Sequence, residues 1–162
     1  MDYALRAMAD GDWEEVRRIY LAGIATGCAT FETEAPAWTA WDQGHRKSCR
    51  LVAAADGCLL GWAALSAVSS RPVYRGVAEV SLYVDAPARG QGVGSALLEK
   101  LICVSEAEGF WTLQAGIFAS NAASLALHRK HDFREVGRRE KIGQLQGLWH
   151  DTILLERRSK IL

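Results

Sequence analysis

The sequence predicts an α/β fold of the α+β type, in which about seven strands form a mixed, mainly antiparallel twisted sheet flanked by helices. Strand-like and helix-like segments alternate in the order β α α β β β α β α β β. Asp56-Gly57, a dipeptide favoured in tight hairpins, joins two strand-like runs within residues 49–68, which should therefore be antiparallel. A helix-like segment between Asp85 and Thr112 lets the strands on either side of it pair in parallel.

The first part of the chain predicts two helices after a short strand at residues 3–8. Residues 9–26 are expected to be a helix with Asp10 or Asp12 as its N-cap. Its apolar residues recur at helical spacing, namely Trp13, Val16, Ile19, Tyr20 and Ile24. Residues 35–47 form a second, weaker helical pattern.

The clearest strand covers residues 74–86, because two sets of side chains alternate there and must face opposite sides of a sheet. One set is Glu79, Ser81 and Tyr83, and the other is Val80, Leu82 and Val84. A helix is expected next over Val93–Glu108, ended by Gly109, and a strand follows at residues 110–118. A second helix is expected within residues 120–133, with Ser120 or Asn121 as its cap. Two antiparallel strands at residues 134–143 and 148–158 complete the chain's predicted elements.

Length and composition restrict the class of protein. The 162 residues contain no linker, repeat or low-complexity tract, so we expect one domain over residues 1–162. The formal net charge is zero, which gives no electrostatic argument for nucleic acid or an anionic membrane as partner. No apolar run approaches the ~20 residues that span a bilayer, and the acidic N-terminus lacks a signal-peptide pattern. These features predict a cytoplasmic protein.

The four cysteines predict neither a metal site nor a disulfide framework. Cys28, Cys49, Cys58 and Cys103 form no CxxC pair, and no histidine stands at metal-ligand spacing from them. We therefore expect reduced thiols and no bound metal.

A glycine-rich turn precedes the predicted helix at Val93. Its sequence, RGQGVG (Arg89–Gly94), has G-x-G-x-G spacing, which fits neither the dinucleotide fingerprint nor a Walker A loop. Backbone N–H groups from Gln91 to Ser95 can converge on an anion of pyrophosphate size, with Arg89 adding a charge-assisted contact. The alternative is a plain loop before a helix.

RGQGVG resembles the R/Q-x-x-G-x-G/A signature of the GCN5-related N-acetyltransferases (GNAT), which bind the pyrophosphate of acetyl-CoA there. The resemblance covers nearly the whole chain and is closest to the phosphinothricin N-acetyltransferase-like branch. The segments that carry it are Ala29–Trp38, Ala78–Leu98, Leu113–Phe133 and Gly147–Asp151. It implies the GNAT fold, with splayed central strands forming the acetyl-CoA cleft, and a homodimer. It also implies direct attack on the thioester by the amine of phosphinothricin, methionine sulfoximine or methionine sulfone.

The resemblance also implies which residues bind acetyl-CoA. Asn121 is placed against the pantetheine arm or the thioester, although a helix cap is an equally physical role for it. The full set is Leu82, Tyr83, Val84, Arg89, Gly90, Gln91, Gly92, Val93, Gly94, Ser95, Asn121 and Ser124.

Two residues are candidates for proton transfer. A carboxylate in an apolar strand, such as Glu79, is costly unless it is hydrated, paired or used. The resemblance makes Glu79 the general base, and the alternative is a solvent-facing side chain or a pair with Arg75. His128 stands where many relatives have a tyrosine that protonates the leaving thiolate; the alternative is a histidine packed near the coenzyme or on the surface.

Two segments are expected to line the amine pocket. Phe31, Glu32 and Thr33 form one wall, and Val73, Tyr74 and Arg75 form the other. Arg75, or else Arg71, suits a substrate carboxylate or phosphinate, whereas a core Phe31 and a solvated Arg75 are the alternatives.

The chain departs from the family pattern at Asp132, at Ala119-Ser120 and at Leu148, and the segment around Leu148 bears on the substrate and the dimer. Asp132 replaces a usual glycine, and Leu148 stands where relatives often carry a basic residue. Asp tolerates the left-handed backbone conformation better than most residues, so the turn at Asp132 is expected to survive.

Two rival functions remain open. One is a GNAT enzyme for another amine, such as a polyamine, an aminoglycoside or a protein N-terminus, although zero net charge argues against a polycationic acceptor. The other is a non-catalytic acyl-CoA-binding module, against which Glu79 and Asn121 argue.

Overall fold

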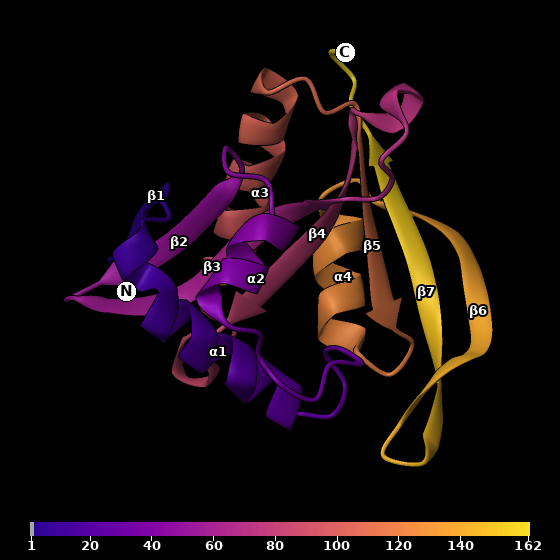
Figure 1. Cartoon of the computed structure of the whole chain (residues 1–162), viewed down its shortest axis with the longest axis horizontal. Helices are drawn as coiled ribbons and strands as arrows, with labels where there is room; N and C mark the ends of the chain where they lie inside the picture. The colour runs from indigo at the N-terminus through magenta and orange to yellow at the C-terminus, as the bar shows by residue number, and fades with distance from the viewer. Residues whose placement is uncertain (1) are drawn as a thin grey trace.

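The computed structural model describes residues 2–162 and contains one seven-stranded twisted sheet (Figure 1). The strand order is β1-β2-β3-β4-β5-β7-β6. The strands are β1 (Ala4–Ala7), β2 (Arg50–Ala55), β3 (Cys58–Ala67), β4 (Val77–Val84), β5 (Thr112–Phe118), β6 (Arg134–Leu145) and β7 (Leu148–Arg158). The helices are α1 (Trp13–Ala25), α2 (Trp38–Gly44), α3 (Val93–Ala107) and α4 (Ala122–Lys130).

Pairing along the sheet is antiparallel except between β4 and β5, as the sequence predicts. The β2–β3 hairpin closes at Asp56 and Gly57, whose φ angles of 50° and 79° are both left-handed. A two-residue hairpin turn needs this left-handed conformation, because its twist then matches the twist of the two strands. The predicted mixed, mainly antiparallel sheet with helices on both faces is therefore confirmed.

The parallel contact between β4 and β5 is short. Only three residue pairs join the strands, and the last is Glu79 with Gln114. Beyond it β5 stays paired to β7 as far as Phe118, while β4 stays paired to β3 as far as Val84. Figure 1 shows β4 and β5 diverging from this point. The predicted splay of the central strands is confirmed.

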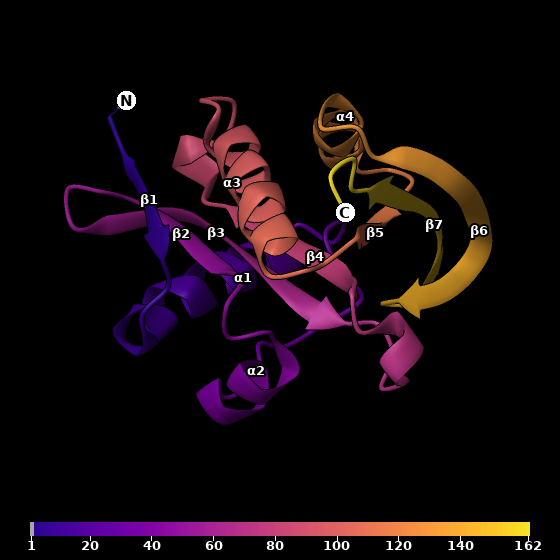
Figure 2. The same ribbon diagram turned by 90° about the horizontal axis from the view of Figure 1, so that it is seen from above.

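Helices cover both faces of the sheet, with α1 and α2 on one side and α3 and α4 on the other (Figure 2). Side chains alternate accordingly along β3. Trp62 and Ala64 belong to the core under α1 and α2, whereas Ala63 and Leu65 belong to the larger core under α3. No helix in residues 2–162 has the length and apolar character to cross a membrane.

Helix termini follow the sequence in part. Asp12 occupies the N-cap of α1, but its carboxylate pairs with Arg6 and accepts from the Ala9 N–H instead of capping the helix. Asn121 does cap α4, where its side chain accepts from the Ser124 N–H. Asp132 takes the left-handed conformation that its family position demands, with φ of 65°.

The junction between β4 and β5 depends on Gly76. Its carbonyl accepts hydrogen bonds from the N–H groups of Trp111 and Thr112, at 2.8 and 3.1 Å. A Cβ placed on Gly76 would lie 2.1 Å from the indole ring of Trp111. Only a residue without a side chain lets the two strands begin side by side here.

Gly76→Ala should therefore destabilise the protein by about 1–3 kcal/mol, the usual range for overpacking. Thermal and urea unfolding measure the change. Gly11→Ala is the control, because a Cβ on Gly11 meets no atom within 4 Å and its φ is not in the left-handed region. Equal stability of the two variants would contradict the role given to Gly76.

Candidate active site

The glycine turn before α3 adopts the backbone that an anion site needs. Gly90 and Gly92 have φ of 74° and 84°, and a Cβ on either would meet nothing within 4 Å. Gly92 is the N-cap of α3, whose first hydrogen bond runs from the Ala96 N–H to the Gly92 carbonyl. The N–H groups of the first turn therefore have no acceptor within the helix and lie at its positive end.

Gly94 has a different reason to be glycine. A Cβ there would lie 3.3 Å from both the Val84 and the Leu127 side chains. The missing side chain lets α3 begin close to the end of β4 and to α4. Gly90 and Gly92 thus shape the turn, while Gly94 sets its distance from the sheet.

Polar side chains surround this turn. The Arg89 Nε donates to the Val84 carbonyl at 3.2 Å, which holds the guanidinium beside the end of β4. The Ser95 hydroxyl lies 2.7 Å from the His131 Nε2 and 3.5 Å from the Lys130 Nζ. Lys130 and His131 come from the end of α4, so sequence reasoning missed them; only tertiary packing brings them to α3.

The separation of β4 from β5 leaves one edge of β4 without strand partners after Glu79 among residues 2–162. Leu82 and Val84 turn their side chains toward the core under α3, and Tyr83 turns to the opposite face. An extended ligand arm can pair with such a strand edge. The edge leads directly to the glycine turn, so this chain fits a ligand with an amide-bearing arm and a diphosphate.

Glu79 sits where the two strands part. Its Oε2 accepts a 2.9 Å hydrogen bond from the Gln114 Nε2, and its side chain is half-buried. Among residues 2–162 no Lys, Arg or His forms an ion pair with it. Arg75, the alternative partner, lies over the Trp111 ring instead. The carboxylate is thus held in place by a neutral group.

A cavity of about 430 Å³ opens beside Ser81 on the α1 and α2 face. We call it the aromatic cavity; the residues that define it are Tyr20, Glu32, Trp41, His45, Trp62, Ser81 and Tyr83. Trp62 stacks on Tyr83 at 4.9 Å, and Tyr20 meets Tyr83 edge-on at 5.0 Å. Burial raises the pKa of both tyrosines, so their hydroxyls remain protonated at neutral pH.

The three residues of the predicted wall at 31–33 lie in different surroundings in the structure. Glu32 lines the aromatic cavity. Phe31 packs instead on Phe118 at 4.5 Å and approaches Gly143, where a Cβ would lie 2.7 Å from its ring. Thr33 is exposed and does not line either of the two cavities described here.

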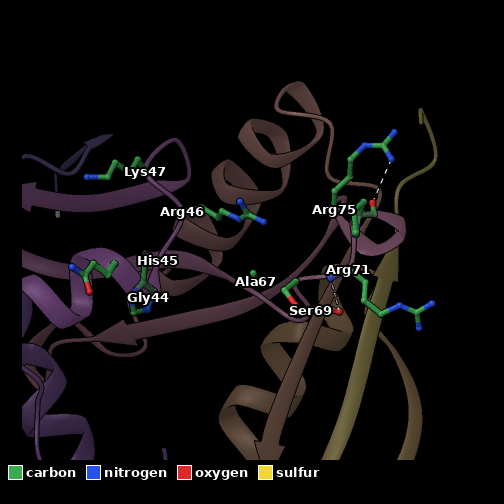
Figure 3. Close-up of a pocket in the computed structure, with 11 residues that line it drawn as sticks. Gly44, His45, Arg46, Lys47, Ala67, Ser69, Arg71 and Arg75 are labelled. Atoms are coloured by element: carbon green, nitrogen blue, oxygen red, sulfur yellow. Dashed lines mark hydrogen bonds between the residues drawn. The ribbon is translucent and has the colours of Figure 1, made fainter.

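The other predicted wall borders a second cavity of about 390 Å³, which we call the basic cavity (Figure 3). It is bordered by His45, Arg46, Lys47, Ala67, Ser69, Arg71 and Arg75. Val73 and Tyr74 are exposed in the turn that follows Arg71 and do not line it. Arg75 and Arg71 border the cavity, but their side chains end toward solvent in Figure 3.

His128 is buried, with 3% of its surface exposed. Its Nδ1 lies 2.8 Å from the Ser124 carbonyl, so this nitrogen carries the proton and donates it. The Nε2 is buried and has no partner within residues 2–162. Burial lowers the pKa of the imidazole, which is therefore neutral near pH 7. In this state His128 offers a lone pair at Nε2, not a proton.

Asn121 uses both ends of its side-chain amide within the protein. Its Oδ1 accepts from the Ser124 N–H at 3.2 Å, and its Nδ2 donates to the Cys28 carbonyl at 3.3 Å. It thereby joins the start of α4 to the loop after α1. The capping role is confirmed, and the contact with acetyl-CoA stays a prediction, as it does for Ser124.

Within residues 2–162 no group of three His, Cys, Asp or Glu side chains is arranged to hold a metal ion. All four cysteines are free thiols.

Sequence reasoning missed several residues of this region. Gln114, which orients Glu79, follows from the register of β4 and β5, a long-range pairing with no local signature. Tyr20 stands among the apolar residues at helical spacing, and no local pattern brings Tyr20, Trp41 and Trp62 to one cavity. The spacing identifies a buried face, but it does not show where that face borders a cavity.

Comparison with known proteins agrees with this architecture. The model of the acetyltransferase (GNAT) family matches residues 11–133. The phosphinothricin N-acetyltransferase of Alcaligenes faecalis is 36% identical over 163 residues, which cover 94% of this chain and 81% of that protein. The L-methionine sulfoximine/L-methionine sulfone acetyltransferase of Pseudomonas paraeruginosa is 35% identical over 120 residues, covering 72% and 70% of the two chains.

A solved structure is also similar. The GNAT superfamily phosphinothricin acetyltransferase of Sinorhizobium meliloti, crystallised with acetyl-CoA, superposes with a TM-score of 0.87 at 31% identity and covers 98% of this chain and 89% of that one. This chain belongs to the GNAT family and is an acetyl-CoA-dependent N-acetyltransferase.

Proposed function

We propose that the protein transfers the acetyl group of acetyl-CoA to the amine of a small amino-acid-like substrate by direct attack on the thioester. The position of Glu79 carries this proposal. Its carboxylate lies where β4 and β5 part, two residues before Ser81 at the aromatic cavity and in the strand that leads to the glycine turn. The names of the relatives support an acceptor of the phosphinothricin or methionine sulfoximine type.

Two groups of residues have different roles: one group holds acetyl-CoA, and the other transfers a proton. The N–H groups from Gly90 to Ser95 and the Arg89 guanidinium hold the diphosphate, and the edge of β4 at residues 82–84 holds the arm. Acetyl-CoA supplies an activated acetyl group as a thioester. The protein mainly brings the two reactants together, which is a large part of the rate enhancement available to such reactions.

Glu79 handles the proton of the acceptor. An amino acid arrives as an ammonium ion, which has no lone pair for attack. The carboxylate of Glu79 takes one proton, directly or through a water molecule, and the amine nitrogen then bonds to the acetyl carbon as the carbon–sulfur bond breaks. The second proton of the nitrogen ends on the coenzyme thiol.

Protonation of the leaving thiolate needs no strong acid, because thiols of this kind have pKa values of about 8.5. His128 in the state observed donates its proton to Ser124 and is neutral. We therefore propose that His128 is a neutral, buried residue of α4 with a free Nε2 lone pair, and we leave the general-acid role that the sequence suggests unassigned.

Release of coenzyme thiol from acetyl-CoA with a panel of amines tests the proposal. We expect turnover with phosphinothricin, methionine sulfoximine, methionine sulfone or a standard amino acid. Turnover confined to polyamines, aminoglycosides or peptides would instead show a GNAT enzyme for another amine. Thermal stabilisation by acetyl-CoA without release on any amine would indicate a binding module.

Glu79→Gln should lower kcat/KM by about 10²–10⁴-fold, the usual contribution of a general base. The amide keeps the size of the side chain and loses its capacity to accept a proton. Glu140→Gln, at an exposed position of β6, is the control for loss of one negative charge. A loss of only a few-fold in Glu79→Gln would remove this residue from the role.

Gly92→Ala should weaken acetyl-CoA binding roughly 5- to 30-fold, because a left-handed backbone costs an alanine about 1–2 kcal/mol. Calorimetric titration with acetyl-CoA measures the change in Kd. Gly137→Ala is the matched control, since its φ is not left-handed and its Cβ would meet nothing within 4 Å. Unchanged affinity in Gly92→Ala would separate the turn from coenzyme binding.

We also propose that residues 1–162 form one domain. We propose further that this domain forms a homodimer through the β6–β7 hairpin. Ile142, Leu148 and Trp149 are more than half exposed there, which is unusual for a cluster of large apolar side chains. Light scattering should give a dimer mass, and Trp149→Ser should lower it. A monomer at tens of micromolar would overturn this assignment. The four free thiols support a reducing, cytoplasmic setting.

A further inference from the structure

The proposed reaction removes two protons from the acceptor nitrogen. This nitrogen carries three hydrogens as an ammonium ion and one as an amide, so two protons leave it in each turnover. A carboxylate takes one proton at a time, and Glu79 therefore accounts for only one of the two. A second group with a free lone pair beside the acceptor would take the other proton as the nitrogen–carbon bond forms.

Few side chains at the aromatic cavity can take this second proton. Tyr20 and Tyr83 keep their hydroxyl protons, because burial raises the pKa of both. Glu32 and Glu34 also line the cavity, but both are exposed, so water competes for their oxygens. His45 lines the cavity as well and is only partly exposed. An imidazole at such a position is the natural candidate, because it titrates near neutral pH.

The hydrogen bonding of His45 leaves one ring nitrogen free. Its Nδ1 lies 2.7 Å from the Trp41 carbonyl, which can only accept, so Nδ1 carries the proton. The Nε2 then holds the lone pair; it has no hydrogen-bond partner within residues 2–162 and is not buried. His45 borders both the aromatic and the basic cavity, and Figure 3 shows it across the basic cavity from Arg71 and Arg75. Its lone pair is therefore open to a ligand.

Packing fixes His45 in this orientation. Its ring stacks on Trp41, with the ring centroids 4.1 Å apart, and meets Trp62 edge-on at 6.5 Å. The Arg50 guanidinium is buried and holds the backbone of the same segment. It donates to the His45 carbonyl at 2.9 Å and to the Arg46 carbonyl at 3.0 Å. Ring and backbone are thus both fixed, and little reorganisation is needed to accept a proton.

The segment that carries His45 lies one strand away from the place where β4 and β5 part. The Arg46 N–H donates to the Leu65 carbonyl of β3 at 2.7 Å, and Leu65 pairs with Val80, the residue after Glu79. Two such steps across a sheet span about 10 Å, since neighbouring strands lie ~4.8 Å apart. An acceptor between them, with a water molecule beside it, can reach both groups.

The surroundings of His45 favour its neutral form. Burial lowers the pKa of the imidazole, the bond to the Trp41 carbonyl acts in the opposite direction, and the charge of Arg50 lowers the pKa again. The other titratable or charged groups around it are Asp42, which pairs with Arg50, then Tyr20, Glu32, Glu34 and Tyr83 at the aromatic cavity, and Arg46, Lys47, Arg71 and Arg75 at the basic cavity.

We propose that His45 is a second proton acceptor in the acceptor site. As the amine nitrogen bonds to the acetyl carbon, the His45 Nε2 takes the second proton of that nitrogen, and water carries this proton to the coenzyme thiol as the carbon–sulfur bond breaks. The proton on Glu79 leaves to solvent, so both groups return to their starting state. His128 does not compete for this role, because its Nε2 is buried and it lines neither cavity. This inference rests on the proposed function and adds a catalytic residue to it.

His45→Phe tests the proposal, because it keeps an aromatic ring over Trp41 and removes the lone pair. Its kcat should fall about 10²-fold, the lower end of the range for acid–base groups, while KM changes little. Thr39→Ala, at an exposed position of α2 that lines neither cavity, should keep the kcat of the intact enzyme. An unchanged kcat in His45→Phe, or an effect confined to KM, would overturn the proposal.

Added imidazole separates a proton acceptor from a structural residue. It should raise the kcat of His45→Ala, because it can supply a lone pair in the space left by the ring, and it should leave the intact enzyme unchanged. The kcat of the intact enzyme should also fall as the pH drops through the pKa of His45, which lies below the ordinary value of about 6.5, since the protonated ring cannot accept. Absence of rescue, or the same acidic limb in His45→Phe, would overturn the proposal.

A measurement without turnover keeps this inference distinct from the proposed function. In protein labelled with ¹⁵N at histidine, His45 should give the signals of a neutral ring with its proton on Nδ1, assigned by their loss in His45→Phe. Methionine sulfone should shift the Nε2 signal of His45 as it binds. Binding by calorimetry with no shift at Nε2 would overturn the role of His45. Failure of every amine to be acetylated would refute the proposed function, while the Nε2 signal would still show whether His45 meets the ligand.

Discussion

The parting of β4 and β5 after a single short stretch of parallel pairing is the constraint on which the rest of the structure depends. Gly76 brings the strands together, three residue pairs join them, and Glu79 is the last residue of β4 that is paired with β5. Each strand then follows its other neighbour, β3 or β7. One free strand edge results, and Glu79, the proposed general base, stands where the two strands part. A sheet that stayed paired along its whole length would have neither the edge nor the opening.

Successive side chains of β4 point to opposite faces of the sheet, so the two faces of this strand have different roles. Val80, Leu82 and Val84 anchor the strand to the core under α3, which also fixes the start of that helix and hence the glycine turn. Glu79, Ser81 and Tyr83 face the helices on the other side, where the aromatic cavity lies. In the proposed function, donor and acceptor are therefore served by separate sets of side chains in one element.

Much of this could be predicted from the sequence, because the signals were local. Alternation in residues 79–84, the Asp56-Gly57 turn, the Asn121 cap and the left-handed glycines each depend on the chemistry of a few neighbouring residues. What escaped prediction depends on long-range packing: the bond from Gln114 to Glu79, the approach of Lys130 to Ser95, and the placement of Arg46 at the same cavity as Arg71 and Arg75. Burial and the Ser124 carbonyl, which together favour the neutral form of His128, also depend on packing that the sequence does not show.

The alternation along β4 has a consequence for how such an enzyme can change over time. The glycine turn leads into α3 on one face of the sheet, while the two cavities are lined by residues of α1, α2, β3 and β4, of the loops around α2 and of the segment before β4. Residues 89–95 of the glycine turn and of the start of α3 line neither cavity. Lineages can therefore drift from one amine to another while keeping the same coenzyme, and a laboratory library restricted to the loops would explore new acceptors from an intact acetyl-transfer framework.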